Sequence, residues 1–139
     1  MTDQENEIRT IFKDTRTIAV VGASSNSFRA SHGVMAFLQR QGYRTIPVNP
    51  QESGEILGEK VYASLRDIPE PVDMVDCFRR SEFITPLAED AVAIGAKVLW
   101  MQLGIVSEEA AAIARKGGLK VVMNRCPAID IPGLGIPPK

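Results

Sequence analysis

Residues 17–27 read TIAVVGASSNS, an apolar run that passes directly into a loop of small polar residues. The run contains Val and Ile without strict polar alternation, which is typical of a strand covered on both faces of a sheet. Gly22 ends the run, and small residues after it let the backbone approach a ligand. The stretch therefore predicts a buried strand followed by a loop that opens toward a helix.

Four further apolar runs of the same kind follow at 43–49, 72–78, 97–103 and 120–124, and helical patterns lie between them. Strands that alternate with helices indicate right-handed crossovers and a parallel sheet. We therefore expect an α/β fold: a Rossmann-like, doubly wound, mainly parallel sheet of five or six strands, with helices on both faces. The length of 139 residues suits a single domain.

The helix boundaries carry recognisable signals. An N-terminal helix is expected at about residues 3–14, with Thr2 or Asp3 as its cap, and a second one at 31–41 ahead of Gly42. Ser107 predicts the start of a helix that ends before Gly117.

The helix after the third run has either Ser81 or Thr85 as its N-cap, and both alternatives stay open because of Pro86. In either case its pattern predicts that Phe83 faces inward. Residues 51–71 read as a long connection with one helical turn at 64–68. The core is expected at about 15–130, and the apolar stretch 131–138 is expected to be an extended tail on this domain or on a second copy.

The composition of the chain argues against several classes of partner and site. Sixteen basic and 17 acidic residues give a net charge of −1, so we expect neither nucleic-acid nor membrane partners. Apolar runs are too short to span a bilayer and the N-terminus is polar, which favours a cytoplasmic protein. Cys77 and Cys126 suit neither a disulfide framework nor a metal site, and free buried thiols are expected.

In open α/β sheets, ligands bind beyond the carboxyl ends of the strands. Ser24 to Ser27 follow the first strand and offer hydroxyl and N–H groups ahead of a helix, a composition that suits phosphate. An ordinary turn would have the same composition, and both interpretations stay open. Arg29 and His32 lie at the start of the next helix, where each could meet a phosphate or simply face solvent.

Two related folds are disfavoured. The loop after Gly22 lacks the later glycines of G-x-G-x-x-G, and the second strand ends in Asn49 and Pro50 rather than an acid, so NAD fits poorly. A response-regulator receiver would need acids where Ser24 lies. Asp73 and Asp76 are instead expected to be structural acids facing a helix N-terminus or solvent.

The other strand ends add candidates. Phe78 is followed by Arg79 and Arg80, which could grip a phosphate beside an aromatic face, although a solvated basic pair has the same pattern. Gln102 to Gly104 bring an amide and a glycine to the same edge, and Asn124 and Arg125 add another amide and a guanidinium.

These segments, in this order, resemble the CoA-binding domain family, which includes the N-terminal domain of the succinyl-CoA synthetase alpha subunit. The resemblance rests on VVGAS at 20–24, PVNP at 47–50, FRR at 78–80, QLG at 102–104 and NRCP at 124–127, and it extends from about Thr15 to the C-terminus. It implies a coenzyme A or acyl-CoA ligand. It also places Ser24 to Ser27 at the pyrophosphate and Gln102 to Gly104 near the pantetheine arm.

Together, the residues and the resemblance give seventeen expected ligand contacts: Gly22, Ala23, Ser24, Ser25, Asn26, Ser27, Arg29, Asn49, Pro50, Cys77, Phe78, Arg79, Arg80, Gln102, Leu103, Gly104 and Asn124.

The chain departs from the synthetase at Gln51 and Glu52, where a basic residue is expected, so Arg29, Arg79 or Arg80 would have to meet phosphate charge. The synthetase phosphohistidine lies in a further domain outside the resemblance, so the ligase reaction is not implied. The sequence offers no nucleophile with a base, and we expect no catalysis and no metal.

The expected function is that of a carrier, sensor or partner-dependent module for CoA. The alternatives are an NAD(P)-dependent enzyme subunit or an interaction protein that retains the fold. A homodimer or an unidentified protein partner is compatible with each of these three functions.

Overall fold

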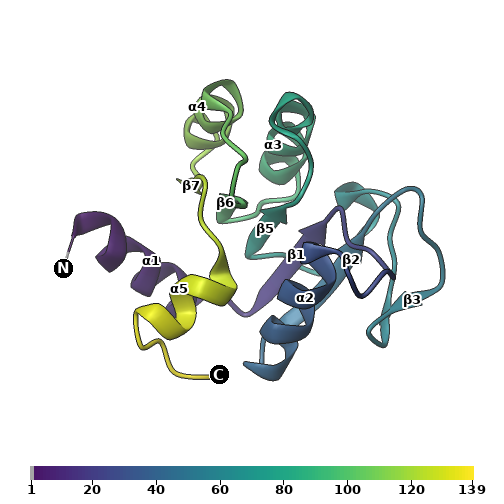
Figure 1. The fold of residues 1–139 in the computed structure, drawn as a ribbon. Coiled ribbons are helices and arrows are strands. Elements are labelled where there is room, and N and C mark those ends of the chain that lie inside the picture. Colours follow the sequence, from purple (N-terminus) through teal and green to yellow (C-terminus); the bar gives the residue numbers. More distant parts are fainter. Residues whose placement is uncertain (1) are drawn as a thin grey trace.

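A computed structural model describes residues 2–139 as an α/β domain around one parallel sheet (Figure 1). The strand order is β2-β1-β5-β6-β7, and every neighbouring pair is parallel. The strands are β1 Thr17–Val21, β2 Arg44–Val48, β5 Met74–Cys77, β6 Val98–Met101 and β7 Lys120–Val122. The predicted Rossmann-like architecture is confirmed with five strands, each one to three residues shorter than the apolar run that predicts it.

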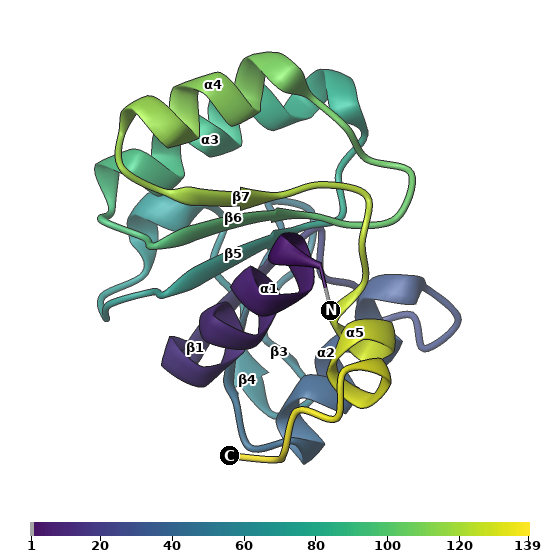
Figure 2. The ribbon, with the colours of Figure 1, turned by 90° about the vertical axis from the view of Figure 1, so that its left-hand side faces the viewer.

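Helices cover both faces of the sheet, as predicted. On one face lie α1 Asp3–Asp14, α2 Ala30–Arg40 and α5 Pro127–Gly133, and on the other lie α3 Ile84–Ala93 and α4 Glu108–Lys116 (Figure 2). Side chains along β1 alternate between the two layers: Ile18 and Val20 pack toward α1 and α2, whereas Ala19 and Val21 pack toward α3 and α4. β1 is therefore buried on both faces, and every residue of β5 and β6 is buried as well, which explains the continuous apolar runs.

The predicted helix starts are largely confirmed. Thr2 Oγ1 accepts a hydrogen bond from Glu5 N, the Glu5 carboxylate accepts one from Thr2 N, and Ser107 Oγ accepts one from Ala110 N. The third helix is an exception: its N-cap is Phe83 rather than Ser81 or Thr85, and a 3-10 turn, η2 Ser81–Phe83, precedes it. That turn shifts the helical register, so the prediction that Phe83 faces inward is wrong: its side chain is 46% exposed.

Residues 51–71 contain the predicted helical turn as η1 Leu65–Asp67, and also a small hairpin that the sequence pattern did not predict. Its strands are β3 Glu55–Ile56 and β4 Glu59–Lys60. The turn between them uses positive φ angles at Leu57 and Gly58, and leucine rarely adopts this conformation.

The C-terminal segment is helical where an extended tail from residue 131 is predicted. Pro127 starts α5, where its missing N–H is harmless, and Ile131 is buried in the core. The chain then returns to α2, where Lys139 N donates to Gln41 O at 2.7 Å.

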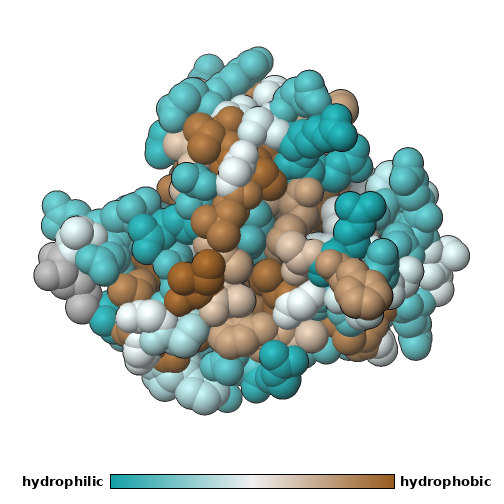
Figure 3. Space-filling model, in the orientation of Figure 1, coloured by the Kyte–Doolittle hydropathy of each residue, from teal (hydrophilic) through white to brown (hydrophobic). Residues whose placement is uncertain are grey.

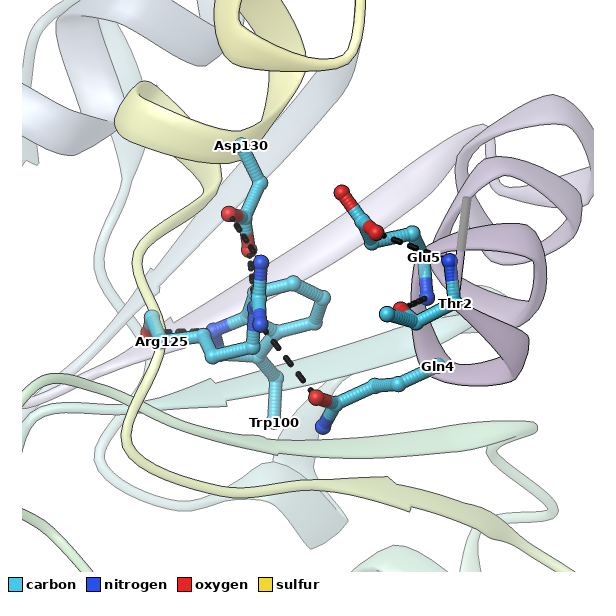
Figure 4. Close-up of polar contacts among 6 residues, drawn as sticks. All are labelled: Thr2, Gln4, Glu5, Trp100, Arg125 and Asp130. Carbon is cyan, nitrogen blue, oxygen red and sulfur yellow. Dashed lines mark hydrogen bonds and ion pairs between the residues drawn. The ribbon is translucent and has the colours of Figure 1, made fainter.

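Arg125 fixes α5 against the rest of the domain (Figure 4). Its guanidinium donates two hydrogen bonds of 2.9 Å to the Asp130 carboxylate and one of 3.2 Å to Gln4 Oε1. The Arg125 carbonyl also accepts a 2.7 Å bond from Trp100 Nε1. A bidentate pair of this kind holds a short helix firmly.

The described part of the chain, residues 2–139, has no helix that is long and apolar enough to cross a membrane.

Candidate ligand-binding cleft

A cleft of about 610 Å³ opens at the carboxyl ends of β1, β2 and β5, the edge where the fold predicts a ligand. Seven predicted contacts line it: Gly22, Ser24, Arg29, Asn49, Phe78, Arg79 and Arg80. Ser31, Gln51, Glu52 and Phe83 line it as well and were missed as contacts. Glu52 lies four residues beyond the end of β2, at the place where the resemblance to the synthetase leads us to expect a basic residue.

Gly22 lets the ends of β1 and β5 approach closely. Its φ is +89°, and a Cβ atom there would lie 3.2 Å from Phe78 Cβ. Phe78 N donates to Val21 O at 2.9 Å, which holds the two strand ends together. Glycine is needed here both for its backbone conformation and for this close contact.

Hydrogen bonds from backbone N–H groups to side chains of the same segment shape the loop after β1. Asn26 N donates to Ser24 Oγ at 3.0 Å, and Phe28 N donates to Asn26 Oδ1 at 2.9 Å. Asn49 ties the end of β2 to this loop, because its Nδ2 donates to Ala23 O at 2.9 Å. The loop is therefore a defined turn.

Three guanidinium groups surround the loop. Arg29 starts α2, and within residues 2–139 no side chain caps the backbone N–H groups of this helix. Arg79 lies with its guanidinium carbon 5.2 Å from the Phe83 ring centroid, and Arg80 is exposed beside it. Uncapped helical N–H groups and arginines both favour a bound anion. The lining titratable side chains are these three arginines and Glu52, a set suited to holding an anion.

A second cavity of about 260 Å³ shares Arg79 and Phe83 with the cleft. Pro50, another predicted contact, lines this cavity together with apolar side chains that include Leu87. It could receive a flat apolar group of a ligand whose phosphates lie in the cleft.

Three predicted contacts lie in the interior: Ala23, Cys77 and Gln102 are all buried. The Cys77 side chain packs into the α3–α4 layer, and burial raises the pKa of its thiol. The expectation of free buried thiols is confirmed for both cysteines. A thiol held neutral by burial is a poor nucleophile.

Gln102 meets a buried acid. With its NH₂ group turned toward Asp76, the amide nitrogen lies 3.0 and 3.2 Å from the two carboxyl oxygens. Asp76 is fully buried, and desolvation raises the pKa of its carboxyl. The expectation that both acids face a helix N-terminus or solvent is therefore wrong for Asp76. Asp73 is also structural, since its carboxylate accepts hydrogen bonds from Arg16 N and Thr17 N at the start of β1.

Ser25, Asn26 and Ser27 are exposed in the loop after β1. The last three predicted contacts, Leu103, Gly104 and Asn124, lie on the β6–β7 side of the edge. Asn124, with a φ of +59°, accepts a 2.7 Å hydrogen bond from Gly104 N through its Oδ1. Leu103, Val106 and Ile129 are about half exposed there, at 56%, 47% and 57%. Figure 3 shows apolar surface gathered in the middle of this face, between the α3–α4 layer and helices α2 and α5.

The two sides of the edge are connected, because Val106 N donates to Ser81 Oγ at 3.0 Å. Ser81 directly follows Arg80, which lines the cleft. Within residues 2–139, no group of three His, Cys, Asp or Glu side chains could hold a metal ion.

Comparison with known proteins agrees with this geometry. Residues 16–132 match the CoA binding domain family. The Bacillus subtilis protein YneT, itself uncharacterised, is 42% identical over 120 residues, which cover 86% of this chain and 88% of YneT. A hypothetical protein from Pyrococcus horikoshii, whose structure is solved, is 37% identical, with a TM-score of 0.91, and the match covers 96% of this chain and 92% of that one.

A more distant relative is the ADP-forming acetate–CoA ligase II subunit alpha of Pyrococcus furiosus, which is 29% identical over 129 residues. The match covers 85% of this chain but 28% of the ligase subunit, so the chain spans about a quarter of that relative. The family match extends over most of the sequence and includes every strand of the sheet. The chain belongs to the CoA-binding domain family.

Proposed function

We propose that this protein binds coenzyme A or an acyl-CoA in the cleft at the carboxyl ends of β1, β2 and β5. The observation that carries the proposal is the gathering of Arg29, Arg79 and Arg80 around the loop after β1. A chain with a net charge of −1 thus concentrates positive charge at the edge where α/β folds bind nucleotides.

The shape of the site suggests how the ligand lies. The pyrophosphate would meet the loop at Ser24 to Ser27 and the N-terminus of α2, where N–H groups and Arg29 favour negative charge. The adenine would enter the neighbouring cavity between Pro50 and Phe83. The pantetheine arm would then run toward Leu103 and Gly104, across exposed apolar surface.

We further propose that the protein acts as a carrier, a sensor or a partner-dependent module without catalysis of its own. The titratable groups that line the cleft are arginines and one glutamate, whereas general acid–base catalysis near neutral pH favours a group with a pKa near 7. Cys77 is too deeply buried to exchange with a ligand thiol. A relative in which this domain is part of a larger ligase subunit is compatible with a role beside a partner.

Calorimetric titration of the reduced protein with coenzyme A tests the proposal, with dephospho-CoA and NAD as comparison ligands. Ser24→Glu places a negative charge in the loop and should weaken CoA binding by roughly 100-fold, since it repels the phosphates and fills their site. Thr10→Glu adds the same charge on the exposed face of α1 and should leave binding unchanged. Equal binding of NAD and CoA, or no CoA binding at millimolar ligand, would contradict the proposal.

A further inference from the structure

Glu52 already places an anion against the loop that we propose for the phosphates. Its Oε2 accepts hydrogen bonds from Ser25 N at 3.1 Å and from Ser25 Oγ at 3.3 Å. The neighbouring N–H groups of Asn26 and Phe28 are satisfied within the loop itself. Ser25 N therefore donates to an acceptor on another segment, as it would to a bound ligand.

A short turn holds Glu52 in this place. Asn49 Oδ1 accepts from Gln51 N at 2.9 Å, and Glu52 N donates to Asn49 O at 3.2 Å. The same Asn49 side chain donates to Ala23 O, so the turn after β2 is fastened to the loop after β1. The Glu52 carboxylate is half-buried and lines the cleft together with the arginines.

A carboxylate and a phosphate are both anionic acceptors, and they cannot share the Ser25 donors without strong repulsion. We propose that Glu52 is a built-in competitor for the ligand's phosphate. It holds the loop in its binding shape when the cleft is free and is displaced when a ligand's phosphate reaches Ser25. This inference rests on the proposed function, and it makes Glu52 the residue that determines how strongly a ligand must bind in order to occupy the site.

Competition by Glu52 should make the site select ligands that carry several phosphates and an adenosine over ligands with a single phosphate. A ligand with one phosphate gains little by displacing a carboxylate that already satisfies the same donors. A ligand with several phosphates and an adenosine also contacts the arginines and the neighbouring cavity, and these contacts offset the displacement. Coenzyme A has these groups, whereas inorganic phosphate does not.

Titration of Glu52→Gln with coenzyme A tests the role of the charge. The glutamine keeps an oxygen acceptor for Ser25 but loses the negative charge, so CoA should bind about 10-fold more tightly than to the wild type. Glu55→Gln is the matched control, since it removes the same charge from an exposed residue of β3 and should change affinity less than about twofold. Pantetheine, which has no phosphate, should bind the three proteins alike.

Glu52→Ala provides a second variant that also removes the competing acceptor, and it should again gain affinity for CoA. CoA binding by the wild type with no gain in either Glu52 variant beyond that of Glu55→Gln would overturn the competitor role and leave the proposed function standing. No CoA binding by the wild type or by any variant would overturn both.

Discussion

The two halves of the carboxyl edge of the sheet differ in chemistry. The half formed by β1, β2 and β5 is lined by Arg29, Arg79 and Arg80 and by loops that side-chain hydrogen bonds hold in place. The half formed by β6 and β7 presents exposed apolar side chains such as Leu103 and Ile129. A hydrogen bond from Val106 N to Ser81 Oγ joins the loops of the two halves.

This difference suits a ligand with two unlike ends. A nucleotide with several phosphates needs guanidinium and N–H groups, whereas a thioester arm needs apolar surface that excludes water from it. Coenzyme A combines both parts in one molecule. This division of the edge would be wrong if substitutions in the polar half left the affinity for phosphate-bearing ligands unchanged. It would also be wrong if substitutions in the apolar half left the affinity for the acyl-pantetheine arm unchanged.

The largest effect is expected from the polar half. The double variant Arg79→Gln/Arg80→Gln should weaken CoA binding by roughly 50-fold, because it removes two charged donors from the cleft. It should also reduce the salt dependence of binding, which calorimetry at several ionic strengths would measure. Arg115→Gln, at the end of α4, is the control and should bind CoA as the wild type does. Equal affinities for the double variant and the control would show that the arginines face solvent only.

The second effect concerns the stability of the buried contact between the halves, where the carboxyl of Asp76 on β5 lies beside the amide of Gln102 after β6. Burial raises the pKa of the Asp76 carboxyl in the folded protein, so the folded state holds this proton more tightly than the unfolded chain. From about pH 4, the ordinary pKa of Asp, upward to the folded-state pKa, this acid makes the free energy of unfolding fall as pH rises. Asp76→Asn removes that penalty and should stabilise the protein by about 1 to 3 kcal/mol at pH 7.

Urea unfolding between pH 4 and 8 measures this difference. The gain of Asp76→Asn over the wild type should be small near pH 4 and should grow with pH until the folded-state pKa is passed. Glu89→Gln, an exposed site on α3, should show no such trend. A loss of stability in Asp76→Asn at pH 7 would mean that the charged acid is favoured in the interior.

A smaller effect is expected where Asn124 joins the loops after β6 and β7. Asn124→Ala loses the hydrogen bond from Gly104 N and keeps a side chain at a φ of +59°, so it should destabilise the fold by about 1 to 2 kcal/mol. Asn124→Gly loses the same bond but suits the backbone, and it should destabilise the fold by less than about 1 kcal/mol. Urea unfolding of both variants separates the two contributions, and equal losses would exclude a backbone contribution.

The strands, one helix start and the location of the cleft could be predicted from the sequence. Runs such as 17–22 predict the strands because burial on both faces requires continuous apolar sequence, and Ser107 predicts a helix start because its hydroxyl can cap N–H groups. The rule that ligands bind after the strands leads to the cleft. The resemblance leads to the same family that the wider comparison shows.

The rest depends on contacts between distant segments. The helical C-terminus follows from Arg125 bonding Asp130 and Gln4 at once, which a segment rich in Pro and Gly does not reveal. Asp76 is buried because it lies on the central strand β5, and its partner there is the amide of Gln102 from the segment after β6. Glu52 reaches Ser25 only because Asn49 fastens the turn after β2 to the loop after β1. None of these pairings has a local sequence signal.

The smallest effect should come from the apolar half. Leu103→Asn keeps the approximate size of the side chain but makes it polar, so the arm of an acyl-CoA would lose apolar contact. Because Leu103 is already 56% exposed, the loss in affinity for butyryl-CoA should be only about threefold. The nucleotide part of CoA, without its pantetheine arm, should bind Leu103→Asn and the wild type equally in calorimetry. If both ligands lost affinity equally, Leu103 would act on the loop rather than on the arm, and the division of the edge into a phosphate half and an arm half would fail.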